Sequence, residues 1–373
     1  MTQVTIRAVP EHLAGAILTI DLDAVAANYR TVLDHLNGVA SAAVVKADGY
    51  GLGADKVGPA LAAAGCSIFC VAHIDEGIRL RAVLPDADIH ILNGFLPGAA
   101  EAYAEYHLIP ALGSLFEIAA WKAHCANTPL PCDLHVDTGM LRLGLPPDEL
   151  AAIADDQTLV SGLDVRYVMS HLASADEPGS PQNRRQLTAF HAARRILPMG
   201  AAWFANSSGI FLGPDYHFDM ARPGVALYGV NPTPGRPNPM RPTVHLKARI
   251  AQVREARPGD TVGYGATHAV NGAAKIATLP VGYADGYLRS LSGAGSGTID
   301  GIPVPLVGRV SMDLITLDVS TVPEAQCQPG QWVDLIGPDN TVDAVAEAAG
   351  TIGYEILTSL GRRYHRVYTG DGA

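Results

Sequence analysis

The sequence has little of what a membrane, secreted or nucleic-acid-binding protein needs. Basic residues number 26 against 37 acidic ones, a formal net charge of -11, so neither a nucleic acid nor an anionic membrane surface is an expected partner. No apolar run is long enough to span a membrane. No basic region precedes the short apolar run Ala14–Ile20, which therefore predicts a strand rather than a signal peptide.

Cysteine is scarce as well. The cysteines are odd in number and none belongs to a CxxC pair, so the sequence predicts no disulfide framework and no metal site. They are Cys66, Cys70, Cys125, Cys132 and Cys327. We expect reduced thiols that pack as small hydrophobic residues in a cytoplasmic protein.

What is present predicts a large α/β core. Of the 373 residues 48% are hydrophobic, enough for two domains. The apolar stripe of Asp21–Leu36 predicts a helix, and short apolar strands then alternate with alanine-rich helices. The candidate strands are Ala42–Lys46, Ile68–His73, Ile89–Leu92, Ile109–Leu112, Asp133–Asp137, Tyr167–His171, Ala202–Asn206 and Met220–Leu227. Eight parallel strands with intervening helices favour a (β/α)8 TIM-like barrel over an open sheet.

A proline-rich segment, Asn231–Pro242, ends this pattern, because neither a helix nor a central strand tolerates that density of proline. Beyond it we expect a mainly β domain with one helix, Val342–Ala349. Its candidate strands are Val244–Val253, Lys275–Leu279, Thr298–Ile299, Val304–Val307, Leu314–Val319 and Gln331–Ile336. The expected domains are residues 13–240 and 241–373, with residues 1–12 a candidate addition to the second.

The stretch Ala43–Gly53 joins a buried strand to a lysine and a glycine-rich loop. Lys46 stands at the carboxyl end of that strand, where α/β folds place their chemistry. Partial desolvation lowers the pKa of an amine there and suits it to a Schiff base. The hydroxyl of Tyr50 could hold a phosphate oxygen. Taken alone, this stretch favours a solvated strand-end lysine before an ordinary turn.

Other strand ends and the loops after them carry polar groups that could converge on one pocket. These strand-end residues are Lys46, His73, Asp137, His171 and Asn206. Arg142, in the loop after Asp137, could bind a carboxylate through two hydrogen bonds, although most single arginines are surface charges. The segments Ala205–Gly209 and Arg222–Val225 follow the seventh and eighth strands, whose loops often bind phosphate in barrels.

Glycine-flanked functional side chains recur in the β domain, in Val262–Gly265, Gly282–Tyr287 and Gly308–Asp313. Together with the barrel segments, from Val44 to Glu355, they resemble the alanine racemases, which are pyridoxal phosphate (PLP) enzymes. The resemblance covers nearly the whole chain in order and spacing. It implies a PLP-binding barrel, a homodimer with shared active sites, and interconversion of L- and D-alanine that supplies D-alanine for peptidoglycan.

The resemblance also implies a role for each matching residue. Lys46 and Tyr264 of the partner subunit would be the two catalytic bases, with His171 and Arg222 in support. The cofactor would be bound by Lys46, Tyr50, Asn206, Ser207, Arg222, Gly224, Val225 and Tyr354. Arg142 and the backbone of Met312 would hold the substrate carboxylate. Substrate access would involve Tyr283, Arg289, Arg309 and Asp313.

The chemistry of these residue types fits those roles. Arginine stays protonated, so Arg222 can donate to the pyridine nitrogen without protonating it, and a weaker electron sink favours racemisation over transamination. Racemisation needs a base on each face of the substrate. A tyrosine, with an ordinary pKa of about 10, would need nearby cations and a hydrogen bond from His171 to serve as one.

One position departs from the family pattern. Many members carry a carbamylated lysine seven residues before the carboxylate-binding arginine, and here that position is His135. Imidazole forms no comparable carbamate, so His135 would have to support Arg142 through a hydrogen bond or a bound anion.

Three alternatives stay open. A broader racemase acting on serine or basic amino acids would share these motifs, because the sequence does not show pocket volume. A PLP-dependent decarboxylase with a similar barrel fits the Val262–Gly265 and Ser311–Asp313 segments less well. A non-catalytic PLP-binding protein uses a related barrel but normally lacks the β domain.

Overall fold

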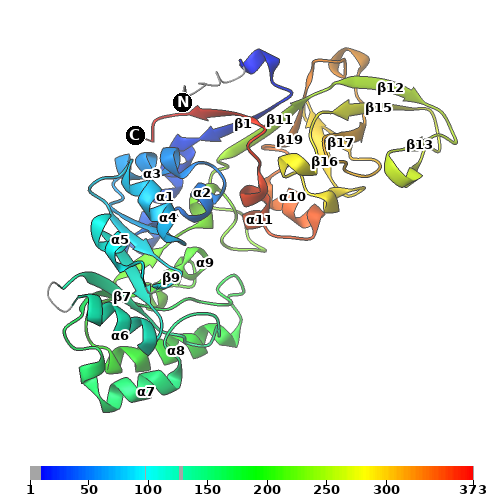
Figure 1. Cartoon of the computed structure of the whole chain (residues 1–373). Coiled ribbons are helices and arrows are strands. Elements are labelled where there is room, and N and C mark those ends of the chain that lie inside the picture. Colours follow the sequence, from blue (N-terminus) through cyan, green and yellow to red (C-terminus); the bar gives the residue numbers. More distant parts are fainter. Residues whose placement is uncertain (1–9, 97, 126–128, 373) are drawn as a thin grey trace. The chain divides into compact units, whose positions relative to one another are not determined.

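The computed structural model describes residues 10–96, 98–125 and 129–372, which form two compact units (Figure 1). The β unit comprises the residues up to Leu22 together with Pro242–Gly370. The barrel unit comprises Asp23–Arg241 and the residues from Asp371 onward.

The first unit boundary differs from the expected one at residue 13. Strand β1 (Ala16–Asp21) pairs with β11 (Val244–Arg249) on one side and with β20 (His365–Thr369) on the other, so this segment belongs to the β unit. The short helix η1 (Glu11–Leu13) precedes it. Residues 1–9 lie outside the described residues, and the expectation for them is not tested.

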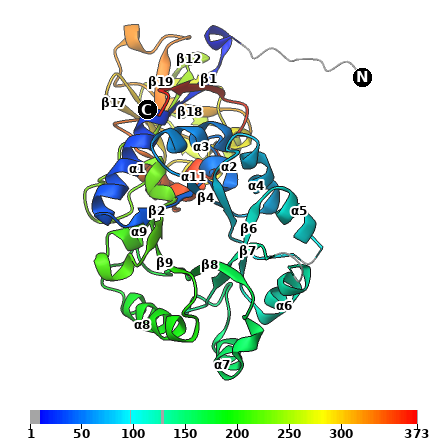
Figure 2. The ribbon, with the colours of Figure 1, turned by 90° about the vertical axis from the view of Figure 1, so that its left-hand side faces the viewer.

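The barrel unit is a ring of parallel strands, which confirms the predicted (β/α)8 fold. Its sheet order is β2-β10-β9-β8-β7-β6-β5-β4-β3, and only Ala42 separates β2 from β3, so the two ends of the sheet meet in one interrupted strand. Ala42 N donates to Ala221 O at 3.0 Å, and Val45 N donates to Cys70 O at 2.9 Å, on the two sides of that junction. Figure 2 shows the helices surrounding the ring of strands.

The strands are short, and several are apolar on both faces, as buried parallel strands are. All five residues of β6 are buried, for example. The strands of the ring are β2 Ala40–Ser41, β3 Ala43–Val44, β4 Ile68–Val71, β5 Asp88–Ile91, β6 Leu108–Leu112, β7 Pro131–His135, β8 Asp164–Met169, β9 Ala201–Asn206 and β10 Met220–Arg222. The helices are α1 Leu22–Leu36, α2 Lys46–Tyr50, α3 Ala54–Ala63, α4 Ile74–Arg81, α5 Ala100–Glu105, α6 Leu115–His124, α7 Pro147–Asp155, α8 Pro181–Ile196 and α9 Ser207–Ile210.

Several predicted barrel strands extend past the observed strand ends, by two residues at His73, Asp137 and His171 and most clearly in the eighth and first strands. The eighth strand ends at Arg222, because Pro223 offers no N–H and the apolar residues after it form the 3-10 helix η4 (Val225–Tyr228). A continuous apolar run suits a buried strand and a buried helix equally well. The first strand ends at Val44, and Lys46 begins the next turn instead of ending the strand.

The β unit contains a six-stranded sheet in the order β17-β16-β19-β11-β1-β20, a three-stranded sheet β12-β15-β18 and the pair β13-β14. Its remaining strands are β12 Gln252–Ala256, β13 Thr261–Val262, β14 His268–Ala269, β15 Ala274–Leu279, β16 Ser296–Ile299, β17 Ile302–Pro305, β18 Ile315–Asp318 and β19 Trp332–Ile336. The mainly β character and the helix α10 (Val342–Ala349) were predicted correctly. The helix α11 (Gly353–Ser359) and β20 were not predicted; Figure 1 shows α10 and α11 near one another.

The expected strand Val244–Val253 is two strands. Between β11 and β12 the chain changes sheets, since Ile250 N donates to Gln331 O while Ala251 N donates to Thr278 O, both at 2.8 Å. Hydrophobic alternation continues through such a corner, so the sequence pattern does not reveal it.

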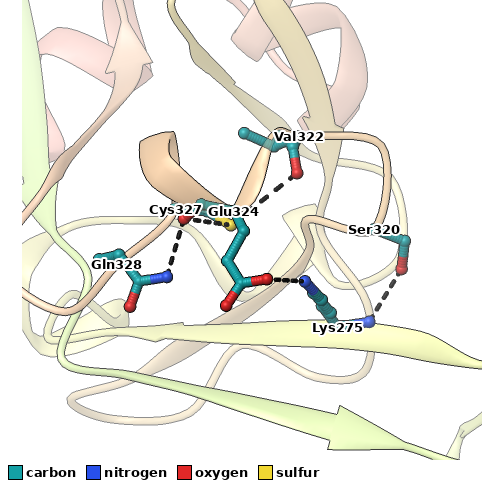
Figure 3. Close-up of polar contacts among 6 residues, drawn as sticks. All are labelled: Lys275, Ser320, Val322, Glu324, Cys327 and Gln328. Atoms are coloured by element: carbon teal, nitrogen blue, oxygen red, sulfur yellow. Dashed lines mark hydrogen bonds and ion pairs between the residues drawn. The ribbon is translucent and has the colours of Figure 1, made fainter.

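One of the cysteines, Cys327, packs in the turn before β19 (Figure 3). The buried thiol of Cys327 lies 3.8 Å from the carbonyl oxygen of Glu324, whose carboxylate pairs with Lys275 at 3.4 Å. Gln328 Nε2 donates to the same carbonyl at 2.8 Å. All five cysteines are buried free thiols, as predicted.

Candidate active site

The polar residues expected to share one end of the barrel do so. Lys46 and His73 each follow their strand, β3 or β4, by two residues, and Asn206 ends β9. Asp137 and His171 follow β7 and β8 in the same way. In a closed parallel barrel all carboxyl ends face one side, which is where barrels carry their chemistry.

A left-handed turn directly follows Lys46. Ala47, Asp48 and Tyr50 have φ values of 53°, 55° and 53°, and Gly49 lies between them at 62°. Such a backbone costs about 1–2 kcal/mol for each non-glycine residue, and a run of them persists only when surrounding contacts hold it. Here Gly49 N donates to Val45 O at 2.9 Å and Gly51 N donates to Ala47 O at 2.7 Å.

The amine of Lys46 is half-buried, and its pKa lies below the ordinary lysine value. Burial is the main cause, followed by repulsion from Arg142. The carboxylate of Glu76 opposes these effects and raises the pKa, while Arg222 lowers it further. A lysine with a lowered pKa has a larger neutral, nucleophilic fraction, as the sequence interpretation requires.

Arg222 is buried beneath the same end of the barrel. Its Nη2 donates to Ser170 O at 2.6 Å and lies 3.5 Å from His171 Nδ1, and its guanidinium lies 5.3 Å from the centre of the Trp203 ring. Its Nη1 is buried with no hydrogen-bond partner among the described residues. Burial lowers the pKa of Arg222 to about 10, so the side chain stays cationic at neutral pH.

A small cradle of hydroxyl and amide groups lies between α9 and η4. Ser207 Oγ accepts hydrogen bonds from Gly224 N at 2.9 Å and from Ala226 N at 3.2 Å. The Tyr50 hydroxyl lies against Gly224, where a Cβ would collide with it. Val225, which the resemblance also implies for cofactor binding, is buried at the start of η4. The predicted phosphate-binding residues of the barrel therefore lie together.

Asn206 serves the local fold. Its Oδ1 accepts from Gly209 N at 2.9 Å and so caps the N-terminus of α9, while its Nδ2 donates to Leu172 O at 3.3 Å. The cap fixes the position of Ser207, the first residue of that helix.

Arg142 is exposed on a loop that Asp137 organises. The Asp137 carboxylate accepts hydrogen bonds from the backbone amides of Gly139, Met140 and Leu141, at 2.8, 2.8 and 3.0 Å. Such bonds favour a tight turn directly before Arg142. Sequence reasoning missed this role, although an aspartate two residues before a glycine is a recognisable turn signal.

Two histidines lie below this loop. Burial, with the cation of Arg222, lowers the pKa of His135 to about 4, and the same two causes hold the pKa of His171 well below the ordinary value. Both rings are therefore neutral at pH 7. In the part of the chain that the structure describes, no hydrogen bond joins His135 to Arg142, so direct support of Arg142 by His135 is not observed.

The expected β-unit residues are largely exposed. The exposed fractions of the Tyr264, Met312 and Tyr354 side chains are 74%, 54% and 39%. Tyr283 begins the turn η6 (Tyr283–Asp285), and Arg289 begins η7 (Arg289–Leu291). The Arg309 guanidinium lies beside Gly265, next to Tyr264.

Arg363, which the sequence did not single out, connects two of these segments. It pairs with the buried carboxylate of Asp285 at 2.9 Å and with Asp313 at 2.7 Å. Two backbone bonds of 3.0 Å, Tyr283 N to Ser311 O and Ala284 N to Met312 O, join the same segments. The turns that carry Tyr283 and Met312 are thus fixed to one another within the β unit.

Two other kinds of feature are absent from the described residues. No group of three or more His, Cys, Asp or Glu side chains could hold a metal ion there. Within the same residues no helix combines the length and the apolar character needed to cross a membrane.

Two family models match the chain. The model for the alanine racemase N-terminal domain matches residues 20–232, and the model for its C-terminal domain matches residues 243–368. The chain belongs to the alanine racemase family. It is accordingly an enzyme of the isomerase class, as the resemblance implied.

Named members of the alanine racemase family are similar over nearly their full length. The catabolic alanine racemase of Mesorhizobium japonicum is 51% identical over 365 residues, 97% of this chain and 95% of that protein. The alanine racemase of Rhodospirillum rubrum is 51% identical over 96% of this chain and 97% of its own. The structure of the Bartonella henselae alanine racemase, with covalently bound pyridoxal phosphate, has a TM-score of 0.92 and 43% identity, covering 95% of this chain and all of that one.

Proposed function

We propose that this protein interconverts L- and D-alanine, using pyridoxal phosphate bound at Lys46 and two bases, Lys46 and Tyr264 of the partner subunit. The observation that carries the proposal is the 51% identity to named alanine racemases over nearly the whole chain. The geometry of the barrel unit supports it independently.

The barrel residues fit the cofactor. The Nη1 of Arg222 is a buried donor with no acceptor in the part of the chain that the structure describes, and a pyridine nitrogen would be one. Gly224 leaves room beside the Tyr50 hydroxyl that any Cβ would fill, and Ser207 provides a hydroxyl at the same place. Tyr50, Ser207, Gly224 and Val225, with Asn206 and Tyr354, would hold the phosphate; Arg222 would donate to the ring nitrogen.

When bound, pyridoxal phosphate makes the α-proton of an amino acid labile by delocalising the charge left on carbon. The chain decides which protons move. The neutral Lys46 amine, favoured by its lowered pKa, removes or returns the α-proton on one face. The Tyr264 hydroxyl of the partner subunit does so on the other face, and His171, a neutral ring, hydrogen-bonds to that tyrosine.

Arg222 would limit side reactions. Because its pKa of about 10 keeps it cationic at neutral pH, it donates to the ring nitrogen and does not transfer a full proton. The charge on the α-carbon is then less delocalised, and the proton returns to that carbon rather than elsewhere. Arg142 and the Met312 backbone would bind the alanine carboxylate, with Tyr283, Arg289, Arg309 and Asp313 along the access route.

We further propose a homodimer, in which the β unit of each chain completes the site of the other. The exposure of Tyr264, Met312 and Tyr354 supports this, since large apolar and aromatic side chains cover interfaces more often than free surface. A cytoplasmic location agrees with five free, buried cysteines. A supply of D-alanine for peptidoglycan is the expected role, although the Mesorhizobium relative is named as catabolic.

Chiral analysis tests the function directly. Purified protein loaded with pyridoxal phosphate should convert L-alanine to a mixture of equal L and D, and borohydride reduction should label Lys46 alone among the lysines. Conversion of serine, lysine or arginine at a comparable kcat/KM would support the broader racemase instead. Cofactor binding without turnover of any amino acid would support a binding protein.

A further inference from the structure

Glu76 has no role assigned so far, and its contacts distinguish it from the other such residues. Glu76 lies in the first turn of α4, and its Oε2 accepts hydrogen bonds from Ala72 N at 2.8 Å and His73 N at 3.1 Å. These two bonds are an ordinary helix cap at the end of β4. Its other carboxylate oxygen, Oε1, takes no part in the cap and accepts a hydrogen bond from Ala47 N at 2.6 Å.

Ala47 directly follows Lys46, and its N–H belongs to the peptide group that joins the two residues. The Glu76 carboxylate therefore joins the lysine turn to the loop after the neighbouring strand. Within the described residues no cationic side chain lies within ion-pair distance of Glu76, so its oxygens are used on backbone amides.

The turn needs such an attachment. Ala47 and Tyr50 have no side-chain preference for the left-handed region, and three non-glycine residues adopt it within four positions. Asp48 Oδ1 fixes the far end of the turn by accepting from Ala54 N at 3.0 Å. Glu76 fixes the near end, where Lys46 is.

We propose that Glu76 is a positioning residue, which holds the peptide group between Lys46 and Ala47 at the start of the left-handed turn and thereby fixes where the lysine amine can reach. The proposal rests on the proposed function for its consequence, since a base that serves one face of a substrate must keep its position through each turnover. The physical link itself, from Glu76 to the turn, does not depend on that function.

Two substitutions separate position from charge. Glu76→Gln has one acceptor oxygen where the carboxylate has two, so it must give up the bond to Ala47 or those of the cap. Glu76→Asp keeps the charge but shortens the arm by one methylene, so it cannot span both sites. Asp75→Asn is the matched control, because Asp75 is the preceding residue, is exposed and pairs with Arg79 at 2.8 Å on the surface.

The first measurement uses the cofactor-free protein. Amide hydrogen exchange followed by mass spectrometry should be faster over residues 46–53 in both Glu76 variants by roughly ten-fold or more, and unchanged in Asp75→Asn. Exchange rates equal to those of the parent in both Glu76 variants would overturn the proposal. Thermal unfolding confirms that each variant is folded, and if Glu76→Gln is not, Glu76→Asp carries the test.

The second measurement uses the loaded enzyme. Both Glu76 variants should lower kcat about ten-fold in both directions and leave the KM for alanine within about two-fold, because Arg142 is untouched. If Glu76→Asp matches the parent while Glu76→Gln does not, Glu76 acts through its charge and the positioning role is wrong. Absence of racemase activity in the parent would instead contradict the proposed function, and the exchange result would stand.

Discussion

Arg222 shows how much chemistry one buried side chain can determine. Three of its contacts, Ser170 O, His171 Nδ1 and the Trp203 ring, fix the guanidinium plane, and Nη1 has no hydrogen-bond partner among the described residues. A carboxylic acid in the same place could protonate a pyridine nitrogen, whereas the guanidinium can only donate to it. If the proposed function holds, the identity of this residue governs where the α-proton returns.

We expect Arg222→Glu to slow racemisation at least about ten-fold and to increase the pyruvate formed per alanine racemised, because transamination becomes competitive. Arg222→Lys keeps a cationic donor and should slow the reaction without raising the share of pyruvate. Chromatographic measurement of D-alanine and pyruvate gives the ratio. An unchanged ratio in Arg222→Glu would refute this role.

His135 makes a separate, pH-dependent contribution. The unfolded chain protonates this histidine near its ordinary pKa of about 6.5, whereas burial lowers the folded value to about 4. Between these values the unfolded state binds more protons, so stability falls as pH falls. From pH 7 to pH 5 the loss attributable to His135 is about 2 kcal/mol.

His135→Gln should remove that loss. Urea unfolding at pH 7 and pH 5 measures it: the fall in unfolding free energy should be smaller in the variant than in the parent by about 2 kcal/mol. The exposed His191, replaced by glutamine, is the control and should leave the fall unchanged. Equal pH dependence in parent and His135→Gln would show that this ring is not the group responsible.

At the scale of elements, the loop that presents Arg142 is closed by a glycine. Gly144 has φ of +109°, and a Cβ there would lie 2.5 Å from Asp137 N and 2.7 Å from the Val136 carbonyl carbon. Both are backbone atoms that cannot move aside. The loop returns to the strand at this residue, where Leu145 N donates to His135 O at 2.8 Å.

Gly144→Ala should therefore destabilise the protein more than Gly65→Ala, whose φ of +100° is similar but whose Cβ would meet nothing within 4 Å. Backbone strain accounts for about 1 kcal/mol in each, and the collision adds to it only at Gly144. Thermal unfolding measures the difference, and the KM for alanine should rise only in Gly144→Ala. Similar values for the two variants would mean that the loop adapts.

The elements also show what the sequence could reveal. Helix α10 begins and ends at the predicted residues, Val342 and Ala349, and the barrel strands lie within a few residues of their expected positions. Local periodicity and capping determine such elements. The left-handed turn after Lys46 could not be predicted, because Ala47 and Tyr50 adopt it only under restraint from Glu76 and its surroundings.

Long-range partners were missed for the same reason. Arg363 contacts Asp313 across 50 residues of sequence, and no local pattern indicates that pairing. The polar residues of the barrel site were predicted from their positions at strand ends, because the strand ends of a parallel barrel share one face. Glu76, which supports Lys46 through the Ala47 amide, has no comparable signal.

For the whole molecule, the central question is whether one site draws on two chains. Lys46 belongs to the barrel unit and Tyr264 to the β unit. An isologous dimer would create two equivalent composite sites. Mixing inactive Lys46→Ala with inactive Tyr264→Phe chains, under conditions that let subunits exchange, should restore activity at one site per mixed dimer. Demonstrated exchange without any recovery would exclude the shared site.

The two-base account is tested most directly by α-proton exchange in Tyr264→Phe. In deuterated solvent, the variant loaded with pyridoxal phosphate should exchange the α-proton of D-alanine, because Lys46 serves that face, while racemisation falls by a factor of about a hundred or more. Nuclear magnetic resonance of each alanine enantiomer measures both quantities. Exchange confined to L-alanine, or racemisation at the parent rate, would contradict the account.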